Sequence, residues 1–274
     1  MDTLLLRYGE LFLKGRNRPS FERQLRQNIE RMTGKKVHST RGRLLLEYFP
    51  EHRQLQRVFG LISYSPAWRV EKDIEKIKEK TLEAATSFSG TFKIETKRSD
   101  KTFPLTSFQV NAAVGQYIEQ NTALSADYKN PRHTLHLEIN QEAVYLFTEI
   151  VPGPGGLPVG SSGTVQLLVE NEASILAGLL MMKRGCSLLP ISKKSKDLSL
   201  LQQFSSRPLP VSGQVLPGNV LVTGETFPRK KQHAEFTLHP LIAYTASQIR
   251  RELATFSFLS TSNSSPRLPV PNLL

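Results

Sequence analysis

The stretch EIVPGPGGLPVGS at residues 149–161 decides how the fold of this chain is organised. Three prolines and four glycines stand in these thirteen positions. Proline removes a backbone donor and glycine weakens backbone order, so neither a helix nor a central strand tolerates this density. The stretch is therefore predicted to be a joint between a front half and a back half of the chain.

The beginning of the front half alternates between strand and helix patterns. Residues 3–8 and 63–70 have the composition of buried strands. Between them the sequence predicts a helix after Pro19, two short strands around Gly42 and a short amphipathic helix near Leu55. The order strand, helix, two strands, helix, strand is that of a ferredoxin-like module.

A second module is predicted between residue 65 and the joint. An exposed helix leads into a strand at 91–97 and a loop at 98–107 that is rich in cations and hydroxyls, and a second helix follows. Residues 133–150 alternate between apolar and polar side chains in the manner of a β-hairpin. A cationic loop next to a helix N-terminus suits phosphate contacts, and the alternative is a solvated connection with no ligand.

The back half opens with a strand at 164–169, a strongly apolar helix at 174–182 and a strand at 188–191. A strand, helix and strand of these lengths predict the start of a parallel sheet.

The remaining sequence is less regular. From 192 to 218 the pattern fades into Lys, Ser and Pro, and we expect no strand there. A strand at 220–225 and a helix at 243–253 follow. Residues 259–274 are rich in Ser and Pro, which predicts a disordered tail.

The charge balance favours a polyanionic partner. The 36 Lys and Arg against 24 Asp and Glu give a formal net charge of +12, and residues 1–60 alone contribute 13 against 6. Such a balance fits nucleic acid or an acidic membrane face, with a merely solubilising surface as the alternative. The chain has no apolar run near the roughly 20 residues of a membrane helix, and residues 1–6 lack the features of a signal peptide. We therefore expect a cytoplasmic protein that does not contact membranes.

Cysteine and histidine offer little chemistry. Cys186 is the only cysteine, which excludes an internal disulfide and a CxxC site. It enters a predicted buried strand, so we expect a packing role, with activation by Lys183 and Arg184 as the alternative. The six histidines have no metal-ligand spacing. The sequence therefore predicts no metal site and no catalytic residue.

A family resemblance is carried by long stretches in the correct order. The chain resembles the tRNA 4-thiouridine synthetase (tRNA sulfurtransferase) family at RYGELFLKGRNR (7–18), KRSDKTFPLTS (97–107), PGPGGLPVG (152–160), LMMKRG (180–185), LVTGE (221–225) and HPLI (239–242). The resemblance implies an α/β fold in three parts. These are a ferredoxin-like domain at 1–65, a THUMP RNA-binding domain at 66–158 and a truncated, Rossmann-like PP-loop domain at 159–258.

In this family the THUMP domain grips the tRNA acceptor end, and the PP-loop domain adenylates a uridine and replaces its oxygen with sulfur. The resemblance assigns RNA contacts to basic and polar positions of the first two domains: Lys14, Arg16, Arg18, Lys97, Arg98, Lys101, Asn130 and Arg132. No stripe of base-stacking aromatics accompanies them in the sequence, so we expect binding that is electrostatic and directed by RNA shape.

The phosphate loop departs from the family pattern. The family has Ser-Gly-Gly-x-Asp-Ser before the helix, whereas this chain has VENEAS at 169–174. The family's glycines let backbone N–H groups converge on phosphate, and here both are lost while two carboxylates are gained. A carboxylate about 4 Å from a phosphate charge costs about 4 kcal/mol at an effective dielectric of 20, more than the ~1 kcal/mol that the helix dipole returns. The resulting degenerate nucleotide site comprises Glu170, Asn171, Ser174, Thr223, Gly224 and Glu225.

Three hypotheses follow from the sequence. The first is a tRNA-binding adaptor in uridine thiolation that has no ATP site and no cofactor. The second is an active sulfurtransferase that binds Mg-ATP through an altered loop. The third is an interaction module that recruits a separate adenylating enzyme. Expected partners are tRNA and a sulfur-donor or adenylating protein, and the sequence leaves open both homodimer formation and whether the chain is an enzyme.

Overall fold

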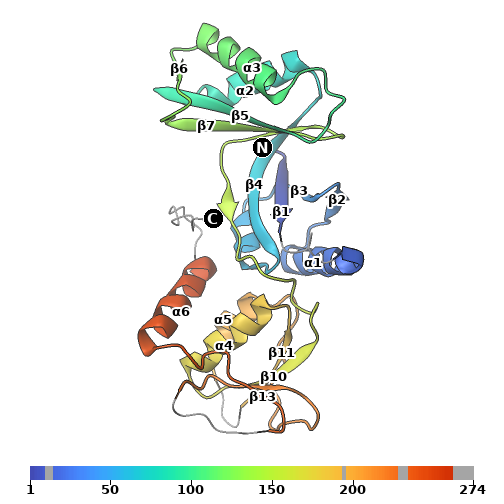
Figure 1. The fold of residues 1–274 in the computed structure, drawn as a ribbon, viewed down its shortest axis with the longest axis vertical. Helices are drawn as coiled ribbons and strands as arrows, with labels where there is room; N and C mark the ends of the chain where they lie inside the picture. The colour runs from blue at the N-terminus through green and yellow to red at the C-terminus, as the bar shows by residue number, and fades with distance from the viewer. Residues whose placement is uncertain (10–14, 193–195, 228–233, 262–274) are drawn as a thin grey trace. The chain divides into compact units, whose positions relative to one another are not determined.

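The structure, a computed structural model, describes residues 1–9, 15–192, 196–227 and 234–261 (Figure 1). The chain divides into two compact units. The first unit comprises Met1–Leu5, Leu45–Tyr48 and Tyr64–Ile150, and the second comprises Leu6–Leu44, Phe49–Ser63 and Val151–Leu274. Within the described ranges, no helix is both long and apolar enough to cross a membrane.

The N-terminal module has the predicted ferredoxin-like order. Its elements are β1 (Thr3–Tyr8), α1 (Arg18–Thr33), β2 (His38–Thr40), β3 (Arg43–Glu47), η2 (His52–Arg57) and β4 (Leu61–Val70). The strands are hydrogen bonded in the order β2-β3-β1-β4. The predicted second helix is a 3₁₀ helix, η2, and α1 begins next to Pro19 and ends at Gly34 in the left-handed conformation. Strands β1, β3 and β4 supply residues to both units.

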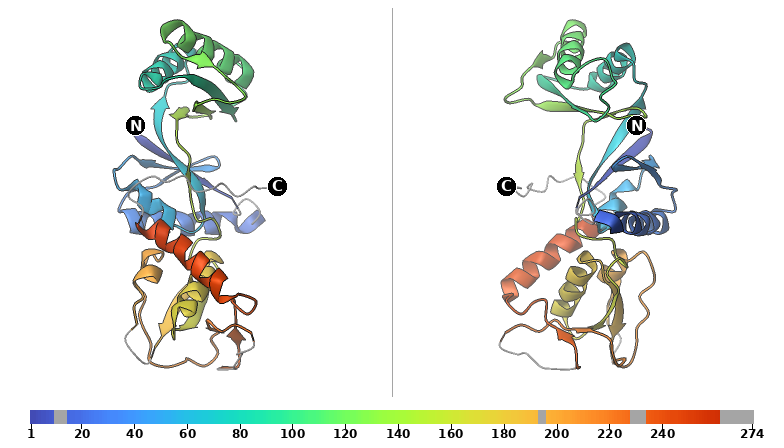
Figure 2. Two further views of the ribbon diagram at one scale, coloured as in Figure 1. Left: turned by 90° about the vertical axis from the view of Figure 1, so that its left-hand side faces the viewer. Right: turned by 45° about the vertical axis from the view of Figure 1, so that its right-hand side comes forward.

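The first unit is an open sheet with two helices on one face (Figures 1 and 2). Its further elements are α2 (Ile74–Ala85), β5 (Thr91–Arg98), α3 (Ser107–Asn121), β6 (Ser125–Ala126), β7 (His133–Ile139) and β8 (Val144–Phe147). The strand order is β4-β8-β7-β5-β6, and β5 runs parallel to both β6 and β7. The predicted hairpin is confirmed, because β7 pairs antiparallel with β8.

The core of the first unit lies between this sheet and the two helices. Ile77 of α2 and Val114 and Ile118 of α3 are fully buried against Phe92 and Ile94 of β5. Both helices are capped at their starts, α2 by the Asp73 carboxylate and α3 by a capping box between Thr106 and Gln109. These caps fix where each helix begins relative to the strand before it.

The second unit ends in a parallel sheet with helices packed on it (Figure 1). Its elements are β10 (Thr164–Leu168), α4 (Glu172–Lys183), β11 (Ser187–Ile191), α5 (Ser199–Gln203), β12 (Leu221–Val222), β13 (Thr237–Leu238) and α6 (Ala246–Thr261). The strands lie in the order β11-β10-β12-β13, and every pair is parallel. The predicted strand, helix and strand at the start of this part are confirmed, and α5 and β13 are elements that the sequence did not predict.

The predicted boundary of the tail is wrong by one helical turn. Helix α6 continues to Thr261, so the first residues of the stretch 259–274 are helical rather than disordered. Phe256 and Leu259 are buried in the core of the second unit, and this packing outweighs the weak helix propensity of the Ser and Thr residues around them. Residues 262–274 lie outside the described residues.

An aromatic cluster joins the N-terminal module to the helices of the second unit. The ring of Phe59, which follows η2, lies 5.3 Å from Phe204 and 6.2 Å from Phe256, and the last two rings are 5.5 Å apart. On the sheet side, a Cβ on Gly178 of α4 would come within 2.7 Å of Leu167, so the helix rests directly on β10. Residues far apart in the sequence therefore share one hydrophobic core.

The predicted joint is hydrogen bonded along its length. Its strand β9 (Val151–Pro152) pairs with β4, and the Gly153 N–H donates to the Ile62 carbonyl at 2.7 Å. Gly156 has a positive φ, and a Cβ there would lie 2.3 Å from the Lys183 carbonyl oxygen. Glycine is needed at 153 and 156 because the backbone there lies directly against the backbone of Leu61 and Lys183.

Candidate RNA-binding surface and nucleotide loop

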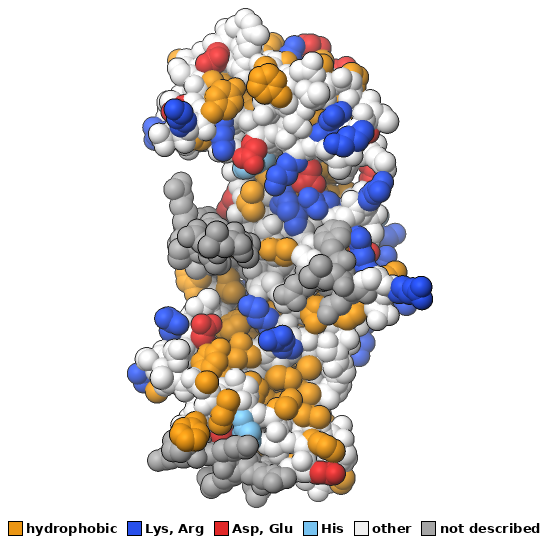
Figure 3. Space-filling model, in the orientation of Figure 1, with side chains coloured by type: hydrophobic (Ala, Val, Ile, Leu, Met, Phe, Trp, Pro, Cys, Tyr) orange, Lys and Arg blue, Asp and Glu red, His pale blue; other side chains and the backbone are white. Residues whose placement is uncertain are grey.

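The basic loop predicted to contact RNA follows β5. The side chains of Lys97 and Lys101 are exposed, whereas Arg98 is partly buried. A guanidinium nitrogen of Arg98 donates to the carbonyls of Phe103 at 3.0 Å and Lys101 at 3.4 Å. Arg98 therefore ties its own loop together, while the two lysines extend into solvent. Figure 3 shows Lys and Arg side chains gathered at the end of β5 that leads into α3.

Asp100 anchors this loop. Its buried carboxylate lies 2.5 Å from the Lys72 ammonium and accepts hydrogen bonds from the backbone N–H and the hydroxyl of Thr102 at 2.9 and 2.7 Å. The contact with Lys72, followed by those with Thr102, lowers the pKa of Asp100 to about 2. Lys72 also donates to the Gln141 carbonyl at 3.1 Å, so the loop is fixed to the β7–β8 turn.

The roles of Asp100 and Lys72 in fixing this loop were not predicted from the sequence. The Asp-x-Thr spacing is typical of an Asx turn, and this signal could have identified Asp100. Nothing in the sequence links Lys72 to it, because 28 positions separate the two side chains.

Asn130 and Arg132 lie at the other end of β5. They flank the turn before β7, where the Asp127 carboxylate accepts the N–H groups of Lys129 and Asn130 at 2.9 and 3.0 Å. The Arg132 N–H donates to the carbonyl of Thr91, the first residue of β5. At roughly 3.3 Å per strand residue, this turn is about 20 Å from the loop at Lys97. The predicted contacts of this unit therefore form two groups, one at each end of β5.

The predicted contacts of the N-terminal module belong to the second unit. Arg16 is exposed just before α1. Arg18 is ion paired with Glu22 at 2.6 Å, and Glu22 also accepts the Tyr8 hydroxyl at 2.6 Å. Burial and the bond to Glu22 raise the pKa of Tyr8 to about 12. To contact RNA, Arg18 would have to exchange the Glu22 carboxylate for a phosphate. Lys14 lies outside the described residues.

Two exposed aromatic side chains qualify the expectation of purely electrostatic binding. Phe108 of α3 is 81% exposed, and Tyr128 in the turn before β7 is 60% exposed. Both belong to the first unit, in the same segments as the basic groups. Phe108 and Tyr128 do not recur at a regular spacing in the sequence, so their exposure could not be predicted from it.

The degenerate nucleotide loop lies at a switch point of the parallel sheet. Strand β10 is followed by α4 and then by β11 on one side, whereas β12 pairs on its other side. Open α/β sheets bind ligands at the carboxyl ends of the strands where the order reverses in this way. Residues 170–174 follow β10 and residues 223–225 follow β12, so the structure brings the two predicted halves together.

The start of α4 is capped by its own side chains. The Asn171 side chain accepts the Ser174 N–H at 3.2 Å, and the Ser174 hydroxyl accepts the N–H groups of Glu170 at 3.2 Å and Asn171 at 3.5 Å. Ser174 is only 1% exposed. Three backbone donors around this helix start, those of Glu170, Asn171 and Ser174, are therefore occupied within the protein.

The segment after β12 presses directly against this cap. A Cβ on Gly224 would come within 2.4 Å of the Ser174 nitrogen. Thr223 shares a hydrogen bond of 2.8 Å with His239 Nδ1, which lies 3.4 Å from the Glu225 carboxylate. These contacts hold the segment after β12 in place over the helix start.

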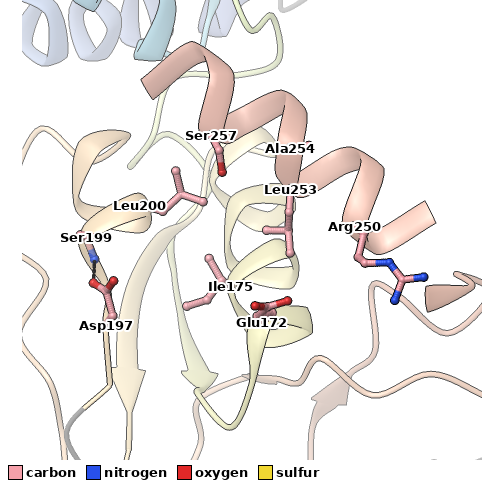
Figure 4. A pocket seen from close by; sticks show the side chains of 9 residues that line it. All are labelled: Glu172, Ile175, Asp197, Ser199, Leu200, Arg250, Leu253, Ala254 and Ser257. Atoms are coloured by element: carbon pink, nitrogen blue, oxygen red, sulfur yellow. Dashed lines mark hydrogen bonds between the residues drawn. The ribbon is translucent and has the colours of Figure 1, made fainter. Parts of the chain in front are cut away.

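A cavity of about 390 Å³ opens between α4, α5 and α6 (Figure 4). Its apolar wall includes Ile175, Leu200 and Leu253, and the carboxylates of Glu172 and Asp197 lie at its edge. Asp197 accepts the Ser199 N–H at 2.8 Å, and this bond lowers the pKa of Asp197. The lining thus holds two carboxylates, Glu172 at the start of α4 and Asp197 before α5, against the one guanidinium of Arg250, a balance that disfavours a triphosphate.

The remaining candidate groups are the lone cysteine and the side chains that could bind a metal. Cys186 is buried with its sulfur 3.8 Å from the Ser162 carbonyl, and burial raises the pKa of the thiol. This environment matches the predicted packing role rather than an activated nucleophile. Across the described ranges, no group of three or more His, Cys, Asp or Glu side chains is placed to hold a metal ion.

Comparison with known proteins identifies two domains. Residues 3–65 match the ThiI ferredoxin-like domain, and residues 71–149 match the THUMP domain. A "Probable tRNA sulfurtransferase" of Staphylococcus aureus (strain MRSA252) is 32% identical over 275 residues, which cover 91% of this chain and 65% of that protein. One from Moorella thermoacetica is 40% identical over 197 residues, covering 68% of this chain and 50% of that protein. The chain thus spans between half and two thirds of the length of these relatives.

Solved structures match over almost the whole chain. The crystal structure of a 4-thiouridine synthetase–RNA complex with bound ATP has a TM-score of 0.80 and 26% identity, covering 95% of this chain and 86% of that one. The protein PH1313 from Pyrococcus horikoshii Ot3 has a TM-score of 0.80 and 29% identity, covering 94% and 100%.

Proposed function

Because the chain belongs to the tRNA sulfurtransferase family, which includes the 4-thiouridine synthetases, we propose that it binds tRNA and serves uridine thiolation without an ATP site of its own. It acts as the subunit that presents tRNA, and a separate protein supplies adenylation and sulfur. We place this activity in the cytoplasm, where the tRNA substrate is found.

The observation that carries the proposal is the closed start of α4. In a phosphate loop the backbone N–H groups at a helix start are free to meet an anion. Here the N–H groups of Glu170 and Ser174 are accepted by the side chains of Ser174 and Asn171, and Gly224 lies so close to the Ser174 nitrogen that a Cβ would come within 2.4 Å of it. A nucleotide would have to break the cap and approach the carboxylates of Glu170 and Glu172.

The tRNA-binding part of the proposal rests on the first unit. Its THUMP domain carries the loop of Lys97 and Lys101 in a fixed conformation, because Asp100 and Lys72 pin it to the neighbouring turn. A pre-ordered cationic loop loses little conformational entropy on binding, which favours contacts with phosphates. A solved relative that is 26% identical forms a complex with RNA, which supports RNA binding by this chain.

The test compares tRNA binding with adenylation. The purified chain is expected to bind folded tRNA with an affinity that falls steeply with salt, and to catalyse no tRNA-dependent exchange of pyrophosphate into ATP. In cells that lack the gene, 4-thiouridine in tRNA should fall, and the intact chain should restore it. Pyrophosphate exchange above background would instead favour the active sulfurtransferase with an altered loop.

A specific observation also favours the interaction-module hypothesis. Exposed apolar side chains gather around the edge strand β13, among them Phe227, Phe236, Leu238 and Ile242. Figure 3 shows hydrophobic side chains prominent over this part of the second unit. In this account the surface receives the adenylating enzyme. Phe236→Asp should then abolish co-elution with that enzyme in gel filtration while tRNA affinity stays unchanged, and persistent co-elution would contradict it.

A further inference from the structure

The cavity between α4, α5 and α6 has no part in the proposed function. Its volume of about 390 Å³ falls within the roughly 300–1,000 Å³ of small-molecule sites in proteins. Its lining combines apolar side chains from all three helices with two carboxylates and one guanidinium. This balance of charge disfavours a nucleotide and favours a cation.

The middle of the cavity is apolar. Ile175 of α4, Leu200 of α5 and Leu253 of α6 pack against the core of the second unit and are only partly buried. Figure 4 shows their side chains gathered between the helices. Because these side chains line the cavity, methylene groups of a ligand can cover the apolar surface that they leave open, which is favourable.

The two carboxylates lie at separate places on the edge. Figure 4 shows Asp197 and Glu172 on opposite sides of Ile175, Asp197 just before α5 and Glu172 at the start of α4. Among the described residues, the Glu172 carboxylate has no hydrogen bond or ion pair, and the Asp197 carboxylate accepts only from Ser199. Both are therefore available to a cationic ligand.

The nearby cations do not neutralise these carboxylates. Figure 4 shows the guanidinium of Arg250 beyond Glu172 and directed away from Asp197. The ammonium group of Lys196 donates to the Glu170 carbonyl at 3.0 Å. Although the chain has a net charge of +12, the edge of this cavity thus presents two negative groups without an ion-pair partner among the described residues.

We propose that this cavity binds an aliphatic diamine, free or as part of a longer polyamine. One ammonium group pairs with Glu172 and the other with Asp197, while the methylene chain covers the apolar side chains between them. Hydrogen bonds from an ammonium group to a carboxylate are stronger than those between neutral groups, and two carboxylates at a fixed separation select the length of the chain. A lysine side chain of a partner protein has a single ammonium group and would satisfy only one of them.

The experiment titrates the full chain, without RNA, with linear α,ω-diamines of three to eight carbons at physiological salt in a calorimeter. The affinity is expected to peak at one chain length. Butylamine, which has one ammonium group, should bind about 10-fold more weakly than the best diamine.

Three variants test the assignment of the residues. Glu172→Gln and Asp197→Asn should each weaken binding of the best diamine about 5- to 10-fold and remove the preference for one length. Asparagine can still accept the Ser199 N–H, so the start of α5 keeps its bond. Ala254→Phe fills the cavity from an exposed position of α6, leaves both carboxylates in place and should abolish binding.

The matched control is Glu235→Gln, which removes an exposed carboxylate of the same unit from outside the cavity. It should change neither the affinity nor the length preference. The inference is overturned if no diamine binds, if butylamine binds as tightly as the best diamine, or if binding is unchanged in the two carboxylate variants or persists in Ala254→Phe. The proposed function does not depend on this result, since tRNA binding is measured without a diamine.

Discussion

Because the start of α4 is capped by its own side chains, we predict that the chain does not bind Mg-ATP at micromolar concentration. A site that binds Mg-ATP at micromolar concentration has a binding free energy of about 8 kcal/mol. Phosphate could reach the N–H groups of Ser174 and Glu170 only after their present hydrogen bonds are broken, at about 1 kcal/mol each. One carboxylate, Glu170 or Glu172, about 4 Å from a phosphate charge costs about 4 kcal/mol more. The remaining free energy corresponds to binding weaker than millimolar.

The assay is isothermal titration with Mg-ATP. The unmodified chain should give no binding heat up to about 1 mM. A chain with Val169→Ser, Glu170→Gly, Asn171→Gly and Ala173→Asp should bind at least tenfold more tightly, because the glycines free the backbone for phosphate and the family's acidic group is restored at 173. Glu172→Gln is the matched control, since it removes a carboxylate and leaves the cap intact, and it should not bind. Micromolar binding by the unmodified chain would refute the reasoning.

The other predictions concern the RNA loop and the core. Replacing Lys97, Arg98 and Lys101 together by Ala should weaken tRNA binding by a few kcal/mol and flatten its salt dependence, and an unchanged affinity in the folded variant would show that the loop is only solvated. The depressed pKa of Asp100, about 2, means that its ionised form stabilises the folded loop at pH values above about 4, and this stabilisation is lost as the pH falls through 4 towards 2. Asp100→Asn should remove this dependence, which hydrogen exchange of the loop amides would measure. Asn28 is buried and donates to the Val159 carbonyl at 2.9 Å, so Asn28→Ala should cost about 1–3 kcal/mol in urea unfolding, and a loss below about 0.5 kcal/mol would contradict its role.

The sequence by itself determined most of the elements of this protein. Strand β5 alternates apolar and polar residues with period two, and α3 carries Val110, Val114 and Ile118 at helical spacing. These patterns arise because each element buries one face, so they can be read without knowing its partner. The departure of residues 169–174 from the phosphate-loop pattern could also be recognised in the sequence, because such a loop needs glycine at defined positions.

The sequence was less informative where packing decides the outcome. Helix α6 continues past Leu253 because Phe256 and Leu259 reach the core beside Phe59, almost 200 positions away. Helix α5 is too short to show a period of its own, and its place is fixed by the burial of Leu201. Local propensity cannot register contacts of this kind.

For the functional surfaces too, the sequence determined some features and the tertiary structure determined others. The sequence identified Lys97 and Asn130 as candidate RNA contacts, and the structure adds that β5 holds their segments about 20 Å apart. The close approach of Gly224 to the start of α4 and that of Tyr128 to Gly115 depend on segments that meet only in the folded chain. The residue types that each site needs were therefore set by the sequence, and their distances, partners and accessibility were set by the tertiary structure, because these depend on how separate elements pack.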